Sequence, residues 1–389
     1  MLVNNTENLR IAWLFPSLAG GNYWHPVLCE FSKIFKQTIV YTGNWSGFSS
    51  GYEDTFKIQV VGKTSYVPTI QPAQSQEGYG RGFINVSPRI VTLLYQFKPH
   101  IIFASGFSLW TLLSVLLKPL GRWRIVILYE GSSPNVDYQD SPIRSWVRRA
   151  IVKSVDAFIT NTSSGSNYLT KILQAQENQV FSRPYQVPDS QALLKLMKVS
   201  QPSDEINLQR PVFLFIGQLI QRKGLEYLLK ACVILQSWGY VNYTLMVLGQ
   251  GPLRDELEVF SKQHNLNIQW IGWVDYGSIG AYFQNADIFV LPTLEDTWGM
   301  VVMESMLFGK PVMCSKYAGA AEMIIDGVNG YLFNPKEPEE LAKLMSSFID
   351  NPNLIPSMGK ESQRLIAQHT PVAAAQFLAE VTERTLQYE

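Results

Sequence analysis

Short apolar runs alternate with longer amphipathic segments along the first half of the chain. Five runs have the length and the β-branched or aromatic content of strands: RIAWLF (10–15), QTIVYTG (37–43), IIFAS (101–105), WRIVILYEG (123–131) and DAFITNTS (156–163). Between them lie helix-like segments such as VLCEFSKIF and IRSWVRRAIVKS. Strands that alternate with helices predict a mostly parallel sheet covered on both faces.

The same pattern restarts after a polar stretch near residues 200–210, which is a plausible linker. Six further strands are expected: PVFLFIG (211–217), YTLMVLG (243–249), NIQWIG (267–272), DIFVLPT (287–293), KPVMCS (310–315) and GYLF (330–333). The prediction is an α/β protein with two Rossmann-like doubly wound domains that face each other across a cleft. The expected boundaries are an N-terminal domain at 1–200, a C-terminal domain at 201–370, and a last helix at 371–389 that crosses back to the N-terminal domain.

The segment from Ile101 to Leu120 is apolar and nearly long enough to span a bilayer. Gly106 interrupts it and Lys118-Pro119 closes it, so a buried strand followed by a short helix is favoured over a membrane span. The first twenty residues lack a basic leading region and contain Pro16 within their apolar run. These features speak against a secretory signal.

Composition adds a charge asymmetry between the two halves. The chain has 389 residues with 32 basic and 32 acidic side chains, but residues 1–200 hold 19 Lys and Arg against 11 Asp and Glu. The first half is therefore +8 and the second −8, which suggests an anionic partner for the first half, with scattered solvated charges as the alternative. Three isolated Cys indicate reduced thiols and a cytoplasmic protein.

Candidate chemistry gathers after the strand at 287–293, in LEDTWGMVVMESM (294–306). A helix from 298 to 307, stopped by Gly309, would expose the N–H groups of Gly299, Met300 and Val301 to a phosphate. Asp296 and Glu304 would flank that group, and carboxylates accept hydrogen bonds from sugar hydroxyls. The alternative is a plain helix cap at residue 296 or Thr297 with a solvated glutamate.

Other strand ends in the same half carry related features. Gly217 and Gln218 end one strand, and Lys223 opens the next helix, where an ammonium would reach the same cleft. Gly249 and Gly251 follow the next strand, but Arg254 replaces the third glycine of a dinucleotide fingerprint, which argues against a nicotinamide cofactor. Trp273 follows Gly272 and either lines a nucleobase pocket or packs as an ordinary aromatic residue.

The order GQLIQRKG, LGQGPLRDEL, WIGWV, LPTLEDTWGMVVMESMLFGKPV and GAAEMIIDGVNGYLF resembles the donor half of the family 4 retaining glycosyltransferases, which have the two-domain GT-B architecture. The resemblance covers residues 211–345 motif for motif. It implies that Lys223, Asp296 and Glu304 act in catalysis. It also implies a donor-binding set made of Gly217, Gln218, Arg222, Gly249, Gly251, Trp273, Glu295, Thr297, Trp298, Gly299, Met300 and Val301.

Three positions depart from the family pattern. The first acid is Asp296 where relatives usually have Glu, with Glu295 as a possible substitute. Gln218 stands where an Arg usually reaches the diphosphate, so Lys223 would be the main cation, helped by Arg222. The loop after the fourth N-terminal strand lacks the usual His. Gly20 and Gly21 would form the first N-terminal loop by analogy, and His25 either approaches the cleft or is structural.

The resemblance implies transfer of a sugar from a UDP- or GDP-linked donor to an acceptor hydroxyl in glycan, polysaccharide or glycolipid synthesis, without a metal or other cofactor. The acceptor would be a sugar, a lipid-linked molecule or a small metabolite, and no nucleic acid is expected. The helix-like segment at 141–155 interleaves basic and apolar residues, so contact with the cytoplasmic face of an anionic membrane and an ordinary amphipathic helix both stay open. A degenerate sugar-nucleotide binding protein and a nucleotide-sugar epimerase are the alternative functions.

Overall fold

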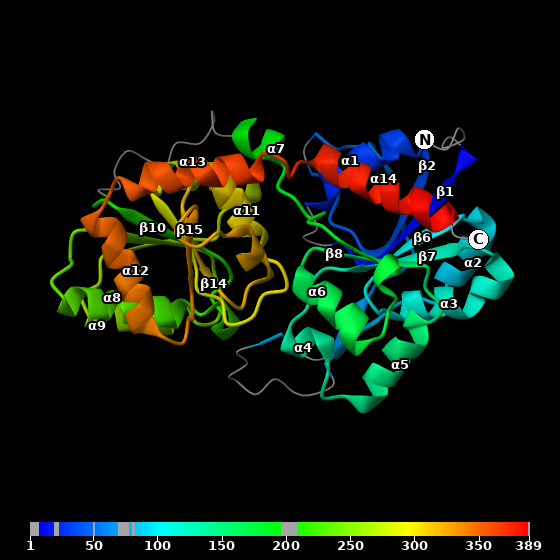
Figure 1. The fold of residues 1–389 in the computed structure, drawn as a ribbon, viewed down its shortest axis with the longest axis horizontal. Coiled ribbons are helices and arrows are strands. Elements are labelled where there is room, and N and C mark those ends of the chain that lie inside the picture. The colour runs from blue at the N-terminus through cyan, green and yellow to red at the C-terminus, as the bar shows by residue number, and fades with distance from the viewer. Residues whose placement is uncertain are drawn as a thin grey trace. The chain divides into compact units, whose positions relative to one another are not determined.

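The chain divides into two compact units (Figure 1). The computed structural model describes residues 8–18, 23–49, 51–68, 78–79, 82–195 and 208–387. One unit comprises Met1–Pro72, Gly80–Val187 and His369–Glu389, and the other comprises Ala73–Tyr79 and Pro188–Gln368. The two units, called unit 1 and unit 2 below, thus part after residue 187, whereas the sequence placed a boundary at residue 200.

Unit 1 is built on a seven-stranded sheet in the order β3-β2-β1-β6-β7-β8-β9, in which every neighbouring pair is parallel. The strands are β1 (Arg10–Ser17), β2 (Gln37–Asn44), β3 (Lys57–Val60), β6 (Ile101–Ser105), β7 (Arg124–Tyr129), β8 (Ala157–Thr160) and β9 (Val180–Ser182). A separate antiparallel hairpin joins β4 (Ser65–Pro68) to β5 (Gly82–Asn85).

Helices cover both faces of this sheet, because alternate residues of each strand point to opposite sides. On one face Trp13 stacks on Phe103 and meets Phe31 edge-on. This face lies under α1 (Trp24–Ile34), against which α14 (Pro371–Gln387) packs. On the other face Ala12 and Leu14 share a buried core with α2 (Ile90–Phe97), α3 (Leu109–Gly121) and α5 (Pro142–Val152).

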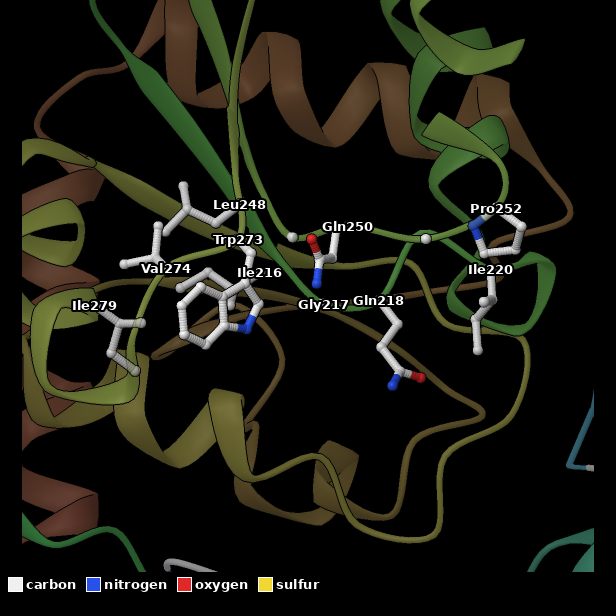
Figure 2. A pocket seen from close by; sticks show the side chains of 12 residues that line it. Ile216, Gly217, Gln218, Ile220, Leu248, Gln250, Pro252, Trp273, Val274 and Ile279 are labelled. Atoms are coloured by element: carbon white, nitrogen blue, oxygen red, sulfur yellow. The ribbon is translucent and has the colours of Figure 1, made fainter. Parts of the chain in front are cut away.

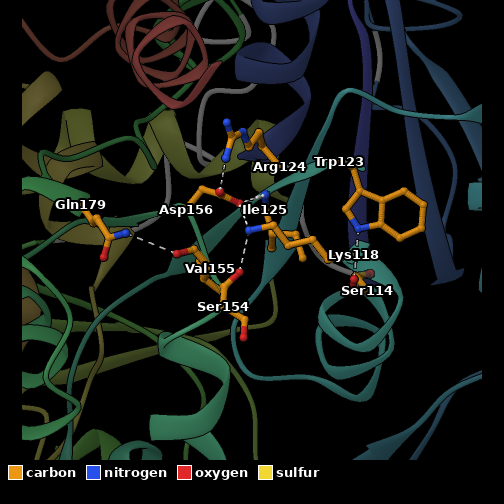
Figure 3. Close-up of polar contacts among 9 residues, drawn as sticks. All are labelled: Ser114, Lys118, Trp123, Arg124, Ile125, Ser154, Val155, Asp156 and Gln179. Atoms are coloured by element: carbon orange, nitrogen blue, oxygen red, sulfur yellow. Dashed lines mark hydrogen bonds and ion pairs between the residues drawn. The ribbon is translucent and has the colours of Figure 1, made fainter. Parts of the chain in front are cut away.

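Short helical segments complete unit 1. They are α4 (Pro134–Asp137), α6 (Ser163–Asn167), a π-helical turn at Tyr168–Ile172 and a 3-10 turn at Glu177–Gln179. The carboxylate of Asp156, just before β8, accepts hydrogen bonds from Lys118 of α3 and from Arg124 and the Ile125 N–H of β7 (Figure 3). The Asp156 side chain thus links the start of β8 to the start of β7 and to the last turn of α3.

Unit 2 contains a six-stranded parallel sheet in the order β12-β11-β10-β13-β14-β15. The strands are β10 (Val212–Ile216), β11 (Thr244–Leu248), β12 (Ile268–Gly272), β13 (Ile288–Leu291), β14 (Val312–Ser315) and β15 (Gly330–Phe333). This is the doubly wound order, whose direction reverses between β10 and β13. Ligands of such sheets bind beyond the carboxyl ends of the strands at that switch point.

The helices of unit 2 sandwich its sheet. They are α7 (Ser190–Lys195), α8 (Leu225–Ser237), α9 (Arg254–Gln263), α10 (Ile279–Asn285), α11 (Met300–Leu307), α12 (Pro338–Asp350) and α13 (Leu354–Ile366), with 3-10 turns at Gln221–Lys223, Tyr276–Ser278 and Gly319–Met323. Helices α8 and α12 pack together and share a buried core with alternate residues of the strands.

The predicted fold class is confirmed, and each of the eleven runs expected as strands contains one. The stretch Ile101–Leu120 consists of β6 and most of α3, in agreement with the strand and helix reading. Within the described residues, no helix is long and apolar enough to cross a membrane. The sequence missed β3, β4, β5 and β9, which are three or four residues each and are not buried, and therefore leave little hydrophobic signal.

Candidate functional site

Two loops at the switch point of unit 2 carry the predicted chemistry. The loop after β10 runs from Gly217 to Gly224, and the loop after β13 runs from Pro292 to Gly299. They are tied together by main-chain and side-chain bonds: Leu294 N–H and the Thr293 hydroxyl both donate to the Arg222 carbonyl oxygen. The parallel β10–β13 pairing therefore delivers both loops to one place.

Gly224 allows this close approach. Its φ is +66°, and a Cβ at this position would lie 2.0 Å from the carbonyl oxygen of Pro292. Any side chain there would push the two loops apart. The Lys-Gly pair in the sequence thus has a structural reason, because the glycine lets the preceding lysine reach the second loop.

Lys223 and Asp296 form an ion pair, with Nζ 2.5 Å from Oδ2. Both side chains are largely buried, at 15% and 8% exposure. Burial by itself would raise the pKa of Asp296. The Lys223 ammonium, helped by Arg222 and by a hydrogen bond from Tyr79, outweighs burial and lowers that pKa below its ordinary value. Asp296 is therefore held as a carboxylate.

Tyr79 is a member of the site that the sequence did not reveal. Its hydroxyl donates to Asp296 Oδ1 at 3.2 Å and lies 3.3 Å from Thr297 Oγ1, while its N–H donates to Glu295 Oε2 at 2.7 Å. The Arg222 guanidinium lies over its ring, 4.0 Å from the centroid. Burial raises the pKa of Tyr79 to about 12, so it acts as a neutral donor.

Glu295 and Asp296 are held in place by hydrogen bonds and by burial. Arg222 Nη1 donates to the Glu295 carbonyl oxygen at 2.8 Å, and the Glu295 side chain is only 4% exposed. The main chain of Asp296 pairs with the loop after β14, through Gly319 N–H to its carbonyl oxygen, and Trp298 is buried. Of the two adjacent acids, Asp296 is the one paired with Lys223.

Helix α11 begins at Met300, two residues later than predicted. The reason is Gly299, whose φ of +99° is left-handed and ends the preceding loop instead of continuing a helix. Val302 N–H already bonds to the Gly299 carbonyl oxygen. Gly309, with φ of +66°, follows the end of the helix as expected.

Glu304 lies in α11 with its side chain buried, contrary to a solvated helix position. Burial raises the pKa of its carboxyl group to about 7, and a hydrogen bond from Tyr276 acts in the opposite direction. A buried carboxylate with so little compensation is costly in the free protein.

A cavity of about 470 Å³ opens at the carboxyl ends of β10, β11 and β12 (Figure 2). Its lining includes the predicted residues Gly217, Gln218, Gly249, Gly251 and Trp273. Figure 2 shows the Trp273 indole and the Gln218 and Gln250 amides among the lining side chains. Trp273 is 63% exposed, which excludes the alternative of ordinary core packing.

The glycines of the cavity are required by close main-chain contacts. Gly249 has φ of +137°, and a Cβ there would lie 1.8 Å from the Gly217 carbonyl oxygen. A Cβ at Gly251 would come within 2.4 Å of the Leu219 carbonyl oxygen. A Cβ at Gly217 would lie 3.9 Å from Lys223 Cδ, so the lysine stem runs along the edge of the cavity.

Of the three predicted N-terminal residues, the structure describes His25 alone. Gly20 and Gly21 lie outside the described residues. His25 is buried in unit 1 beside the rings of Trp45 and Phe56, and its Nδ1 accepts the Ser49 N–H at 3.1 Å. Burial lowers the pKa of His25. In unit 1 it is therefore a packed, neutral histidine and not a solvent-facing one.

Residues 198–365 match the family model described as glycosyl transferases group 1. This span contains both loops, the cavity and α11. The likeness to this family therefore lies in the second half of the chain. Two curated relatives agree: an uncharacterised glycosyltransferase of Methanocaldococcus jannaschii is 32% identical over 36% of this chain and 38% of its own length. The alpha-D-kanosaminyltransferase of Streptomyces kanamyceticus is 24% identical over 60% of this chain and 61% of its own.

The matched region thus spans less than two thirds of either relative. Solved structures extend the likeness to both units at the level of the fold. HepE of Anabaena in complex with UDP has a TM-score of 0.74 and 16% identity, over 97% of this chain and all of that one. Sucrose-phosphate synthase of Thermosynechococcus elongatus has a TM-score of 0.70 and 19% identity, over 97% and 99%. These likenesses show the fold, which is GT-B.

Proposed function

We propose that the protein is a retaining glycosyltransferase that moves a sugar from a UDP- or GDP-linked donor to an acceptor hydroxyl. The observation that carries this proposal is the largely buried Lys223–Asp296 pair at the switch point of the region that matches the glycosyltransferase group 1 model, in the same unit as a cavity of about 470 Å³. HepE, which shares the fold, was solved with UDP and with UDP-glucose.

Each part of the donor has a matching group. The base and ribose would occupy the cavity beneath Trp273, with Glu304 accepting from the ribose hydroxyls. The diphosphate would lie between Lys223 and the N–H groups at the start of α11, where the helix dipole favours an anion. Asp296, kept ionised, would accept from a hydroxyl of the transferred sugar, while Tyr79 holds the other carboxylate oxygen.

The reaction breaks the bond between the anomeric carbon and the diphosphate oxygen and forms a bond from that carbon to the acceptor oxygen. Negative charge grows on the departing diphosphate, and Lys223 with the α11 N-terminus would stabilise it. The acceptor proton would go to a diphosphate oxygen, since no protein base is assigned. A single negative carboxylate near the sugar would also stabilise its oxocarbenium character.

Metal independence belongs to this proposal. Within the described part of the chain, no three His, Cys, Asp or Glu side chains come together as metal ligands. The direct test is turnover in the presence of a chelator, which should leave the rate unchanged if lysine and helix dipole carry the charge.

The experiment that tests the function is turnover of radiolabelled UDP- and GDP-sugars by the full chain with cell extract as the acceptor source. Lys223→Met should lower the rate by about 10²- to 10³-fold, as loss of an electrostatic stabiliser typically does. Lys230→Met is the matched control, because this lysine is exposed on α8. The α- or β-configuration of the new bond, read by NMR, tests retention.

Other outcomes would replace the proposal. Conversion of donor without any acceptor would indicate an epimerase. Nucleotide binding without turnover across all donors would indicate a binding protein, and inversion at the anomeric carbon would contradict the retaining mechanism.

A further inference from the structure

The helix layer formed by α2, α3 and α5 on one face of the unit 1 sheet has an unusual charge pattern. These three helices contain no Asp or Glu, whereas they hold four cations: Lys118, Arg144, Arg148 and Arg149. Their caps add four exposed ones: Arg89, Lys98, Arg122 and Lys153. The opposite face differs, because α1 and α14 carry three acids, Glu30, Glu380 and Glu383, against two cations, Lys33 and Arg384.

The same layer exposes large apolar side chains. On α5, Ile143 and Trp146 are 77% and 71% exposed, and their spacing of three residues places them on one side of the helix. On α3, Leu116 and Leu120 are 64% and 73% exposed, one turn apart. Outer helix faces of soluble proteins are ordinarily polar.

Helices α3 and α5 lie side by side, so these side chains belong to one surface. At one end Lys118 Nζ of α3 donates to the carbonyl oxygen of Ser154, just after α5 (Figure 3). At the other end Leu109 of α3 lines the same cavity as Ile143 and Arg144 of α5. We call the exposed residues of this layer the α3–α5 face.

In the part of the chain that the structure describes, the arginines of α5 bond to carbonyl oxygens and lie over aromatic rings. Arg148 donates to the carbonyl oxygens of Asp137 and Val136, and Arg149 donates to that of Ile172. Arg144 lies 3.8 Å from the centroid of the Tyr138 ring. Lys118 differs, because it forms an ion pair with the largely buried side chain of Asp156.

We infer that the α3–α5 face docks on an anionic lipid bilayer. Its exposed apolar side chains, Ile143, Trp146, Leu116 and Leu120, would enter the headgroup region, and the cations at the helix caps would contact the anionic headgroups. Apolar side chains rimmed by basic ones are what a bilayer with anionic lipids accepts. A second copy of the chain is disfavoured as the occupant, because two such faces would repel each other. This inference does not rest on the proposed function.

The test is sedimentation of the full chain with sucrose-loaded vesicles, either of phosphatidylcholine alone or of phosphatidylcholine with added phosphatidylglycerol. The protein should pellet with the anionic vesicles and much less with the neutral ones, and added salt should release it. Ile143→Ser with Trp146→Ser should weaken pelleting about tenfold or more. Trp238→Ser, at an exposed tryptophan of unit 2, is the matched control and should pellet like the wild type.

A charge variant gives an independent arm. Arg122→Gln with Lys153→Gln should reduce pelleting with anionic vesicles and leave thermal unfolding unchanged, whereas Lys262→Gln with Lys343→Gln in unit 2 should have no effect. Absence of pelleting, equal pelleting with both vesicles, or double variants that pellet like the wild type would overturn the inference. Light scattering that shows a dimer dispersed by Ile143→Ser with Trp146→Ser would overturn it too and assign the face to a second copy.

Discussion

Glu304→Gln should stabilise the free protein at alkaline pH and weaken nucleotide binding at the same time. The substitution keeps the shape of the side chain and its hydrogen-bond acceptor for Tyr276, and it removes only the charge. In the wild type, burial raises the pKa of this carboxyl group from 4.5 to about 7.

The sign and size of the stability effect follow from that shift. The unfolded chain loses the proton near the ordinary pKa of 4.5, whereas the folded chain retains it up to about 7. Rising pH therefore favours the unfolded state throughout this window, and the loss is complete above it. Two and a half pKa units at about 1.4 kcal/mol each give a destabilisation of about 3 kcal/mol, which the amide does not suffer.

The assay is denaturant unfolding of wild type and variant at about pH 5 and about pH 8.5, two values between which most of the pH-dependent loss of stability occurs. The variant should be more stable at the higher pH, and the gap should shrink at the lower one. Glu339→Gln, at an exposed carboxylate of α12, is the matched control and should show no such gap. An equal stability difference at both pH values would refute the reasoning.

The nucleotide affinity of Glu304→Gln shows whether Glu304 binds the ligand or has a purely structural role. A carboxylate accepts hydroxyl hydrogen bonds about twice as strongly as a neutral amide. Nucleotide affinity of Glu304→Gln should fall about tenfold at alkaline pH. A variant that is more stable and binds nucleotide unchanged would leave Glu304 without a function in the site.

Three further predictions concern the loops. Gly224→Ala should destabilise the chain severely, because its Cβ would collide with the Pro292 carbonyl oxygen. The control is Gly239→Ala, at a left-handed glycine with open space around it, which should lower the stability by only about 1 kcal/mol. Thermal melting of both variants measures the difference. Tyr79→Phe removes the hydroxyl that donates to Asp296 and should lower the free energy of unfolding by about 1 kcal/mol. It should also lower the turnover rate more than the affinity for nucleotide. Gln218→Arg restores a guanidinium at the cavity, and calorimetry should show tighter binding of nucleoside diphosphates but not of the nucleoside alone.

The sequence predicted the sheets because parallel strands buried on both faces are continuous apolar runs. It also predicted the loops at the switch point, since their glycines and charged residues follow those runs directly. Gly249 illustrates the success, because its positive φ is a backbone conformation that favours glycine.

The parts that it missed depend on distant contacts. Tyr79 approaches Asp296 across 217 positions of the chain, and no local pattern marks it. The start of α11 was placed too early because the left-handed conformation of Gly299 is decided by the loop after β14, whose Ala320 N–H binds the Trp298 carbonyl oxygen. Burial of Glu304 likewise comes from tertiary packing, which its helical spacing alone does not show.

The most direct test of the proposed site is calorimetric titration of the full chain with UDP, GDP and ADP, on the wild type and on Glu304→Ala. We predict a clear preference for one of the three nucleotides in the wild type and loss of most of that affinity in the variant. Weak binding of all three nucleotides that is unchanged in Glu304→Ala would contradict the assignment of this cavity to a nucleotide sugar.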